Sequence, residues 1–234
     1  MGNKERALTA SVFIDGFNVY FALKDYPDKS IYFNKYKWLN YRSLAQKFLP
    51  PYCSVVSVKY FTAITKWDSQ KKNRHTLYIK ALETVGVETI KGNYINTSKN
   101  VVIECPSSKK QFNTRDGLIN GYVKKGYLFE EKKTDVNIAV HMIKSAISGN
   151  NDIILLFSND TDFIPVFQAI KEINNKIQLK VVTPIGETHN DFISTLTKNN
   201  CKKLKEIHLK NSLLNDPITL KSGTQIHCPK QWKS

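Results

Sequence analysis

Unbroken apolar runs along the chain predict the buried strands of a parallel sheet. The clearest run covers residues 153–157 (IILLF), which are bounded by polar residues and are too few for a helix. Residues 11–15 (SVFID) form a second run that ends in an acid, and residues 53–65 are dense in β-branched and aromatic side chains. Shorter strands are expected at 87–91 and 177–183.

Helical spacing of apolar positions separates most of these strands. The predicted helices cover residues 40–48, 69–85, 134–148, 162–174 and 191–198, with a further short helix after residue 20. Because strands and helices alternate, the pattern predicts an α/β fold with a central, mainly parallel sheet and helices on both faces.

Two segments depart from this alternation. Residues 93–125 are rich in lysine and interrupted by proline and glycine, which predicts an irregular or hairpin insertion on the surface. Such an insertion could embrace a nucleic-acid strand, although a surface loop without a role has the same pattern. The chain therefore divides into a domain over residues 1–210 and a basic tail over 211–234, which we expect to be partly ordered, either over the sheet edge or toward a polyanion.

Charge narrows the class of partner. The chain has 35 Lys and Arg against 20 Asp and Glu, a formal net charge of +15 over 234 residues. Such an imbalance attracts polyanions, so nucleic acid is the favoured partner and an anionic membrane surface the second. A generally basic host proteome would give the same excess.

Composition also bears on the setting of the protein. No apolar run is long enough to cross a bilayer, and the first residues lack the apolar core of a secretory signal. The four cysteines are scattered without a C-x-x-C pair, which argues against a structural zinc site and a disulfide framework. We expect a cytoplasmic protein without a membrane partner, and a homodimer is compatible with the sequence.

Carboxylates follow the ends of two predicted strands. Asp160 and Asp162 come just after residues 153–157, and Asp15 ends the strand 11–15. Because open α/β sheets bind ligands at the carboxyl ends of their strands, these acids are candidate ligands of a divalent cation, which would relieve their repulsion. The plainer alternative is that Asp160 caps the next helix, Asp162 favours its positive end and Asp15 satisfies loop amides.

Further polar residues are placed near these acids by the predicted elements. Asp135 lies in the first turn of a helix for which Thr134 is a natural N-cap, at the edge of a buried stripe, so it either faces inward at a rim or is a plain surface acid. The members of that stripe are Val136, Ala139, Val140, Ile143, Ala146 and Ile147. Asn18 can cap a helix or offer its amide oxygen to a metal or a bound water. His75 is predicted to lie on a solvated basic helix face.

Three stretches in this order, FIDGFN, EEKKTDVNIA and FSNDTDF, resemble the NYN family of PIN-like ribonucleases. The residues that match the family pattern are Phe13, Ile14, Asp15, Gly16, Asn18, Glu131, Lys132, Asp135, Val136, Ser158, Asp160, Asp162 and Phe163. Family members often carry an acid six residues after Asp135, where this chain has His141. Helix geometry predicts His141 on the polar face, opposite the buried stripe.

The resemblance implies a PIN-like (Rossmannoid) three-layer fold and endonucleolytic, metal-dependent hydrolysis of RNA with Mg²⁺ or Mn²⁺. Its implied metal ligands are Asp15 and Asp160, with Asp135 and Asp162 as ligands or holders of metal-bound water. Asn18 and Ser158 would orient these groups, and the implied RNA contacts are Lys132, Lys133 and Ser158. Two alternatives stay open: an RNA-binding module that has lost catalysis, and a phosphohydrolase with Asp160 as nucleophile.

Overall fold

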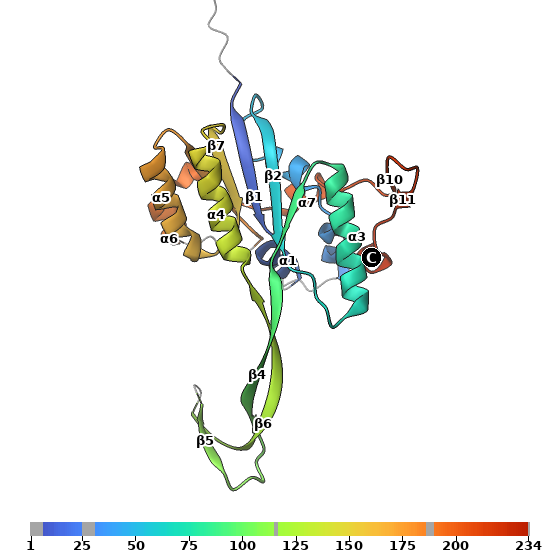
Figure 1. Cartoon of the computed structure of the whole chain (residues 1–234), viewed down its shortest axis with the longest axis vertical. Coiled ribbons are helices and arrows are strands. Elements are labelled where there is room, and N and C mark those ends of the chain that lie inside the picture. The colour runs from blue at the N-terminus through green and yellow to red at the C-terminus, as the bar shows by residue number, and fades with distance from the viewer. Residues whose placement is uncertain (1–6, 25–30, 115–116, 186–189, 234) are drawn as a thin grey trace, which may run out of the picture.

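The computed structural model of the chain describes residues 7–24, 31–114, 117–185 and 190–233. Its centre is a sheet of six strands in the order β3-β2-β1-β7-β8-β9, in which every neighbouring pair is parallel (Figure 1). The strands are β1 (Thr9–Asp15), β2 (Ser54–Thr62), β3 (Glu88–Lys91), β7 (Ile153–Phe157), β8 (Gln178–Thr183) and β9 (Cys201–Lys203). The predicted α/β fold is confirmed.

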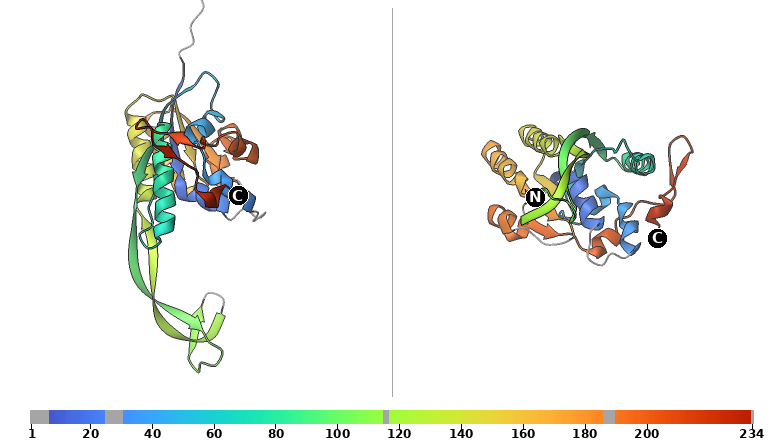
Figure 2. Two further views of the ribbon diagram at one scale, coloured as in Figure 1. Left: turned by 90° about the vertical axis from the view of Figure 1, so that its right-hand side faces the viewer. Right: turned by 90° about the horizontal axis from the view of Figure 1, so that it is seen from below.

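Helices cover both faces of this sheet (Figures 1 and 2). One face carries α1 (Gly16–Lys24), the 3₁₀ helix η1 (Ile31–Lys37), α2 (Tyr41–Gln46), α3 (Ser69–Thr84) and α7 (Glu206–Lys210), and the other carries α4 (Thr134–Ile147), α5 (Ile164–Ile173) and α6 (Asn190–Thr195). Alternate residues of β1 enter the two cores, because successive side chains of a strand point to opposite faces. Val12 and Ile14 belong to the first core and Phe13 to the second.

The strand order changes direction between β1 and β7. The chain runs outward from β1 through β2 to β3 and then returns to place β7 on the other side of β1. Ile14 is paired with Phe157, so the residues that follow these two strands emerge side by side. Such a switch point is where open α/β sheets bind ligands.

The insertion is a long antiparallel hairpin that projects from the body (Figure 1). Its strands are β4 (Asn93–Glu104), β5 (Gln111–Thr114) and β6 (Gly117–Lys132), and pairing runs from Asn93↔Lys132 to Glu104↔Gly121. We call residues 93–132 the arm. It is longer than the predicted 93–125, because β6 continues until just before α4. At its base Trp67 stacks on Phe129, with ring centroids 3.9 Å apart.

The C-terminal tail packs against the helical layer that contains α1, α2 and α3. It includes β10 (Ile218–Thr219), β11 (Gln225–Ile226) and the 3₁₀ helix η4 (Lys230–Trp232). Ile226 and Cys228 are buried in the first core, and the ring of Trp232 lies 5.7 Å from that of Tyr78. The expectation of a partly ordered tail, either over the sheet edge or toward a polyanion, did not include this packing, because single apolar residues anchor the tail without any periodic pattern. Within the described ranges, no helix is both long and apolar enough to span a bilayer.

Candidate active site

Asp15 is the buried carboxylate at the end of β1. Its side chain is 4% exposed, its Oδ1 accepts a hydrogen bond from the backbone N–H of Asn18 (3.0 Å), and its Oδ2 accepts one from Ser158 Oγ (3.0 Å). The first bond caps the start of α1, so Asp15 does satisfy a backbone amide of the loop, as the plainer alternative expected. Gly16 allows this sharp exit from the sheet, because a Cβ there would lie 2.5 Å from the carbonyl oxygen of Phe61.

The loop after β7 is held to the same point by a chain of hydrogen bonds. Ser158 Oγ accepts from the N–H of Asp160 (3.1 Å), and Asp160 Oδ1 accepts from the N–H of Asp162 (3.0 Å). Asn18 Oδ1 accepts from the N–H of Asn159 (3.0 Å), so this amide oxygen joins the two loops instead of facing a metal. Ser158 is completely buried and donates to Asp15, so it orients this carboxylate, and its contact with RNA stays a prediction.

The acids from the three sequence segments act on one another electrostatically. The pKa of Asp15 is raised to about 6, chiefly by burial; the hydrogen bonds from Asn18 and Ser158 oppose this rise, and the negative charges of Asp135 and Asp160 add to it. The pKa of Asp135 is also raised, first by partial burial and then by Glu131, Asp160 and Asp162. The charges of Asp135 and Asp160 therefore act on Asp15, and the charges of Glu131, Asp160 and Asp162 act on Asp135.

The carboxylate oxygens of these acids are suited to a hard cation, although the side chains do not form a complete metal-binding site. In the part of the chain that the structure describes, no three His, Cys, Asp or Glu side chains are grouped closely enough to hold an ion together. Mg²⁺ commonly binds proteins through one or two carboxylates and keeps several of its waters. The oxygen chemistry of these acids and the raised pKa of Asp15 fit such a site.

Asp135 is presented by a helix whose orientation differs from the prediction. The buried residues of α4 are Thr134, Ile138, Met142 and Ala146, whereas Val136, Val140 and Ile147 are exposed. Apolar residues occupy two sides of this helix; of the predicted stripe, Ala146 is buried and Ile143 packs partly against the second core, whereas Val136, Val140 and Ile147 were wrong. His141 is consequently partly buried beside Phe61, with ring centroids 5.6 Å apart, instead of lying on the solvated face.

The start of α4 also corrects the predicted N-cap. Lys133 occupies the capping position with a left-handed φ of 80°, and Thr134 is the first helical residue. The backbone N–H of Thr134 donates to Glu131 Oε1 (3.1 Å), and its hydroxyl donates to the same oxygen. Glu131 therefore fixes the turn that presents Asp135.

The two lysines expected to contact RNA lie at this turn. Both Lys132 and Lys133 are exposed, and Lys132 Nζ pairs with Glu130 Oε2 at 3.1 Å. Their contact with RNA stays a prediction.

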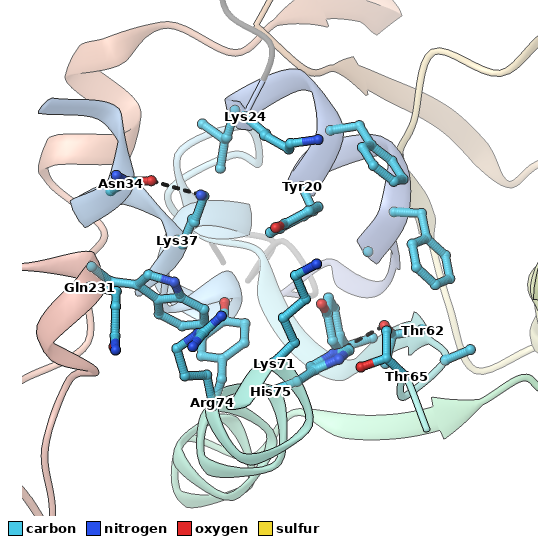
Figure 3. A pocket seen from close by; sticks show the side chains of 18 of the residues that line it. Tyr20, Lys24, Asn34, Lys37, Thr62, Thr65, Lys71, Arg74, His75 and Gln231 are labelled. Carbon is cyan, nitrogen blue, oxygen red and sulfur yellow. Dashed lines mark hydrogen bonds between the residues drawn. The ribbon is translucent and has the colours of Figure 1, made fainter. Parts of the chain in front are cut away.

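A pocket of about 420 Å³ lies next to the acids, between α1, α3 and the end of β2 (Figure 3). Its wall combines aromatic rings with cationic side chains, and no carboxylate is among the described residues that line it. His75 belongs to this wall: its Nε2 lies 3.2 Å from Thr62 Oγ1, and burial lowers its pKa to about 4. The prediction of a solvated His75 was wrong, because the basic face of α3 turns partly inward.

Comparisons with known proteins bear on this architecture. The model of the NYN domain family matches residues 9–203. The chain is 27% identical over 214 residues to 6-hydroxy-3-succinoylpyridine 3-monooxygenase of Pseudomonas putida, an alignment that covers 82% of this chain and 64% of that protein. It thus spans less than two thirds of that relative's length.

A crystal structure of a protein of unknown function from Vibrio parahaemolyticus has a similar fold. The TM-score is 0.54 at 19% sequence identity, over 91% of this chain and all of that one. This likeness concerns the fold alone. The family match covers most of the sheet, both helical layers and the acidic loops, and the chain therefore belongs to the NYN domain family, within the PIN-like nuclease superfamily.

Proposed function

We propose that the protein is a metal-dependent ribonuclease that hydrolyses phosphodiester bonds of RNA at the acidic edge of its sheet. The observation that carries this proposal is that the charges of Asp135 and Asp160, which come from distant segments, raise the pKa of Asp15 at the switch point, and that the charge of Asp160 also raises the pKa of Asp135. Membership of a nuclease superfamily supports the choice of reaction. Active sites are where such carboxylates are crowded together.

The carboxylates would hold Mg²⁺ or Mn²⁺. Asp15 and Asp160 are the expected direct ligands, and Asp135 and Asp162 the expected further ligands, directly or through water. When bound, the ion would supply an activated water for in-line attack and would stabilise charge on the leaving oxygen. The donor atoms are all carboxylate oxygens, which such hard cations prefer.

The remaining residues position these groups and hold the substrate. Ser158 and Asn18 fix the orientation of Asp15 by the two hydrogen bonds that its carboxylate accepts. Exposed Lys133 and the lysines of the arm would bind phosphates of the strand on either side of the cut. The arm's length and charge suit contact with an extended single strand.

A cleavage assay tests the proposal. End-labelled RNA, and DNA of the same sequence for comparison, are each incubated with the protein in Mn²⁺, in Mg²⁺ or in EDTA. RNA should be cut only with a divalent metal. Asp15→Asn should abolish cutting and retain RNA binding, whereas Asp191→Asn, which alters an exposed acid on α6, should leave the rate unchanged. Cleavage that survives EDTA or Asp15→Asn would refute the proposed chemistry.

A binding-only module is the second candidate. Two observations favour it: the described acids are not grouped as a ready metal cage, and His141 stands where family members often carry an acid. Tight RNA binding without cleavage in any metal would select this alternative.

The name of the Pseudomonas putida relative raises a third candidate, oxidation of a small aromatic acid. The pocket favours it, since aromatic rings and cations line it. Oxygen consumption that depends on 6-hydroxy-3-succinoylpyridine, with a two-electron donor added, would support that chemistry, and none is expected of a ribonuclease.

A further inference from the structure

We propose that the pocket beside the acids binds one nucleotide of the RNA strand, with its base among the aromatic rings and its phosphate against the cations. The assignment of that nucleotide as a neighbour of the cleaved bond rests on the proposed function. The pocket itself is separate from the carboxylates that would perform the cleavage.

The pocket begins where the acidic site ends. Gly16, which follows Asp15 directly, lines it, and so does Thr62 at the end of β2. Asp15 is paired in register with Phe61, the residue before Thr62. Neighbouring strands lie about 4.8 Å apart. A nucleotide in the pocket would therefore adjoin a phosphate at Asp15.

Aromatic side chains from separate parts of the chain line the pocket. Tyr20 and Phe21 belong to α1, Tyr94 comes from the base of the arm, and Trp232 comes from the tail. Tyr20 is 36% exposed and Phe21 47% exposed, with Lys37 Nζ 5.3 Å from the centre of the Tyr20 ring and Lys24 Nζ 5.7 Å from that of Phe21. Stacking on such rings accepts any base, because every base has an aromatic face.

Cationic side chains from three elements surround the same opening. They are Lys24 on α1, Lys37 on η1, and Lys71 and Arg74 on α3 (Figure 3). Lys71 Nζ pairs with Asp68 at 3.4 Å, and the charge of Asp68 also acts on Arg74, whose guanidinium is suited to two parallel bonds with a phosphate. Because no described lining residue is acidic, the pocket favours an anion over a cation.

Polar atoms on the pocket wall can bind the edge of a base. The pKa of about 4 keeps the His75 ring neutral at pH 7, and the ring is held by Thr62. Among the described residues, Thr65 Oγ1 is buried without a hydrogen-bond partner. An unpaired buried hydroxyl is costly, and a ligand group that bonds to it would remove that cost.

Calorimetric titration with adenosine and uridine 5′-monophosphates in EDTA tests the pocket without any cleavage. We expect both to bind with dissociation constants of roughly 1 mM or lower. Arg74→Gln should weaken this binding about tenfold, through loss of the bonds to phosphate. Tyr20→Leu should weaken it about fivefold, through loss of stacking.

Lys72→Gln is the matched control, because Lys72 is an exposed cation on the same helix and does not line the pocket. It should leave nucleotide affinity within about twofold of the parent protein. Equal weakening by Arg74→Gln and Lys72→Gln would overturn the inference, since it would show binding to general positive charge. So would the absence of nucleotide binding at about 10 mM.

Benzoate distinguishes a nucleotide site from a site for small aromatic acids. It should bind much more weakly than either nucleotide, and equal affinity would overturn the nucleotide assignment. These outcomes are independent of catalysis. If RNA is cut but no nucleotide binds, the pocket inference alone fails; if nucleotides bind as expected but no RNA is cut, the proposed ribonuclease alone fails.

Discussion

Asp15 is the residue at which the requirements of folding and of the proposed activity oppose each other. Burial raises its pKa from 3.8 to about 6, so the folded chain binds a proton at Asp15 more tightly than the unfolded chain does. Its contribution to stability is fully present below the unfolded pKa and is lost as the pH rises through the folded pKa. Above that pH, the protein carries a buried charge that only a cation would balance.

Asp15→Asn should therefore stabilise the metal-free protein at high pH. The amide keeps an acceptor for the N–H of Asn18 and removes the buried charge. We expect a gain of about 1–2 kcal/mol in the free energy of unfolding near pH 8, and almost none near pH 4. Urea denaturation in EDTA at both pH values measures this difference. A variant less stable than the parent protein near pH 8 would contradict it.

Ser158→Ala should move the pH dependence of cleavage. The bond from Ser158 lowers the pKa of Asp15, so its loss should raise that pKa and shift the acid limb of the kcat/KM profile upward by about 0.5–1 unit. Ser148→Ala, which changes an exposed hydroxyl after α4, serves as the control. An unshifted acid limb would show that Asp15 does not govern the profile.

At the scale of elements, the arm is the part whose stability depends most on how its base packs against the rest of the protein. An isolated two-stranded hairpin is marginally stable, and most side chains of β4 and β6 are exposed. Tyr94 and Phe129 at its base pack on Trp67, with ring centroids 4.8 Å and 3.9 Å from it. This attachment aims a lysine-rich ribbon away from the body.

Replacement of residues 97–128 by Asn-Gly should remove the ribbon and preserve the domain. Asn96 and Phe129 are directly opposite each other, so a two-residue turn can join them and keep the Trp67 stack. We expect RNA affinity to fall about tenfold at low salt and its salt dependence to weaken, because phosphate contacts are lost. Fluorescence anisotropy over a KCl series measures both.

The melting temperature is the control for this deletion, and it should change by only a few degrees because neither hydrophobic core contains a residue of the described ranges 97–114 and 117–128. RNA binding with unchanged affinity and salt dependence would show that the arm has no part in it.

The sequence predicted the bounds of some elements well and the buried face of others poorly. The strand 153–157 was predicted residue for residue, because a short apolar run in an α/β protein has few alternatives. The buried face of α4 was not, because Val136 and Val140 form as good a stripe as Ile138 and Met142. Only packing against the sheet decides between two such faces.

At the scale of the whole molecule, topology explains why the acids could be predicted and the pocket could not. The carboxyl ends of parallel strands share one edge, so Asp15 and Asp160 were expected together from local patterns alone. The pocket wall draws on α1, η1, α3, the arm and the tail. Its assembly depends on tertiary contacts that leave no local pattern in the sequence. A homodimer and a cytoplasmic location stay predictions.

Titration of Mn²⁺, with the free ion followed by its electron paramagnetic resonance signal, tests the central claim most directly. We predict saturable binding to the RNA-free protein near pH 8, weakened at least about tenfold by Asp15→Asn and by Asp160→Asn and unchanged by Asp191→Asn. Equal Mn²⁺ binding by the parent protein and both site variants, or no binding at all, would contradict a shared metal site at this edge of the sheet.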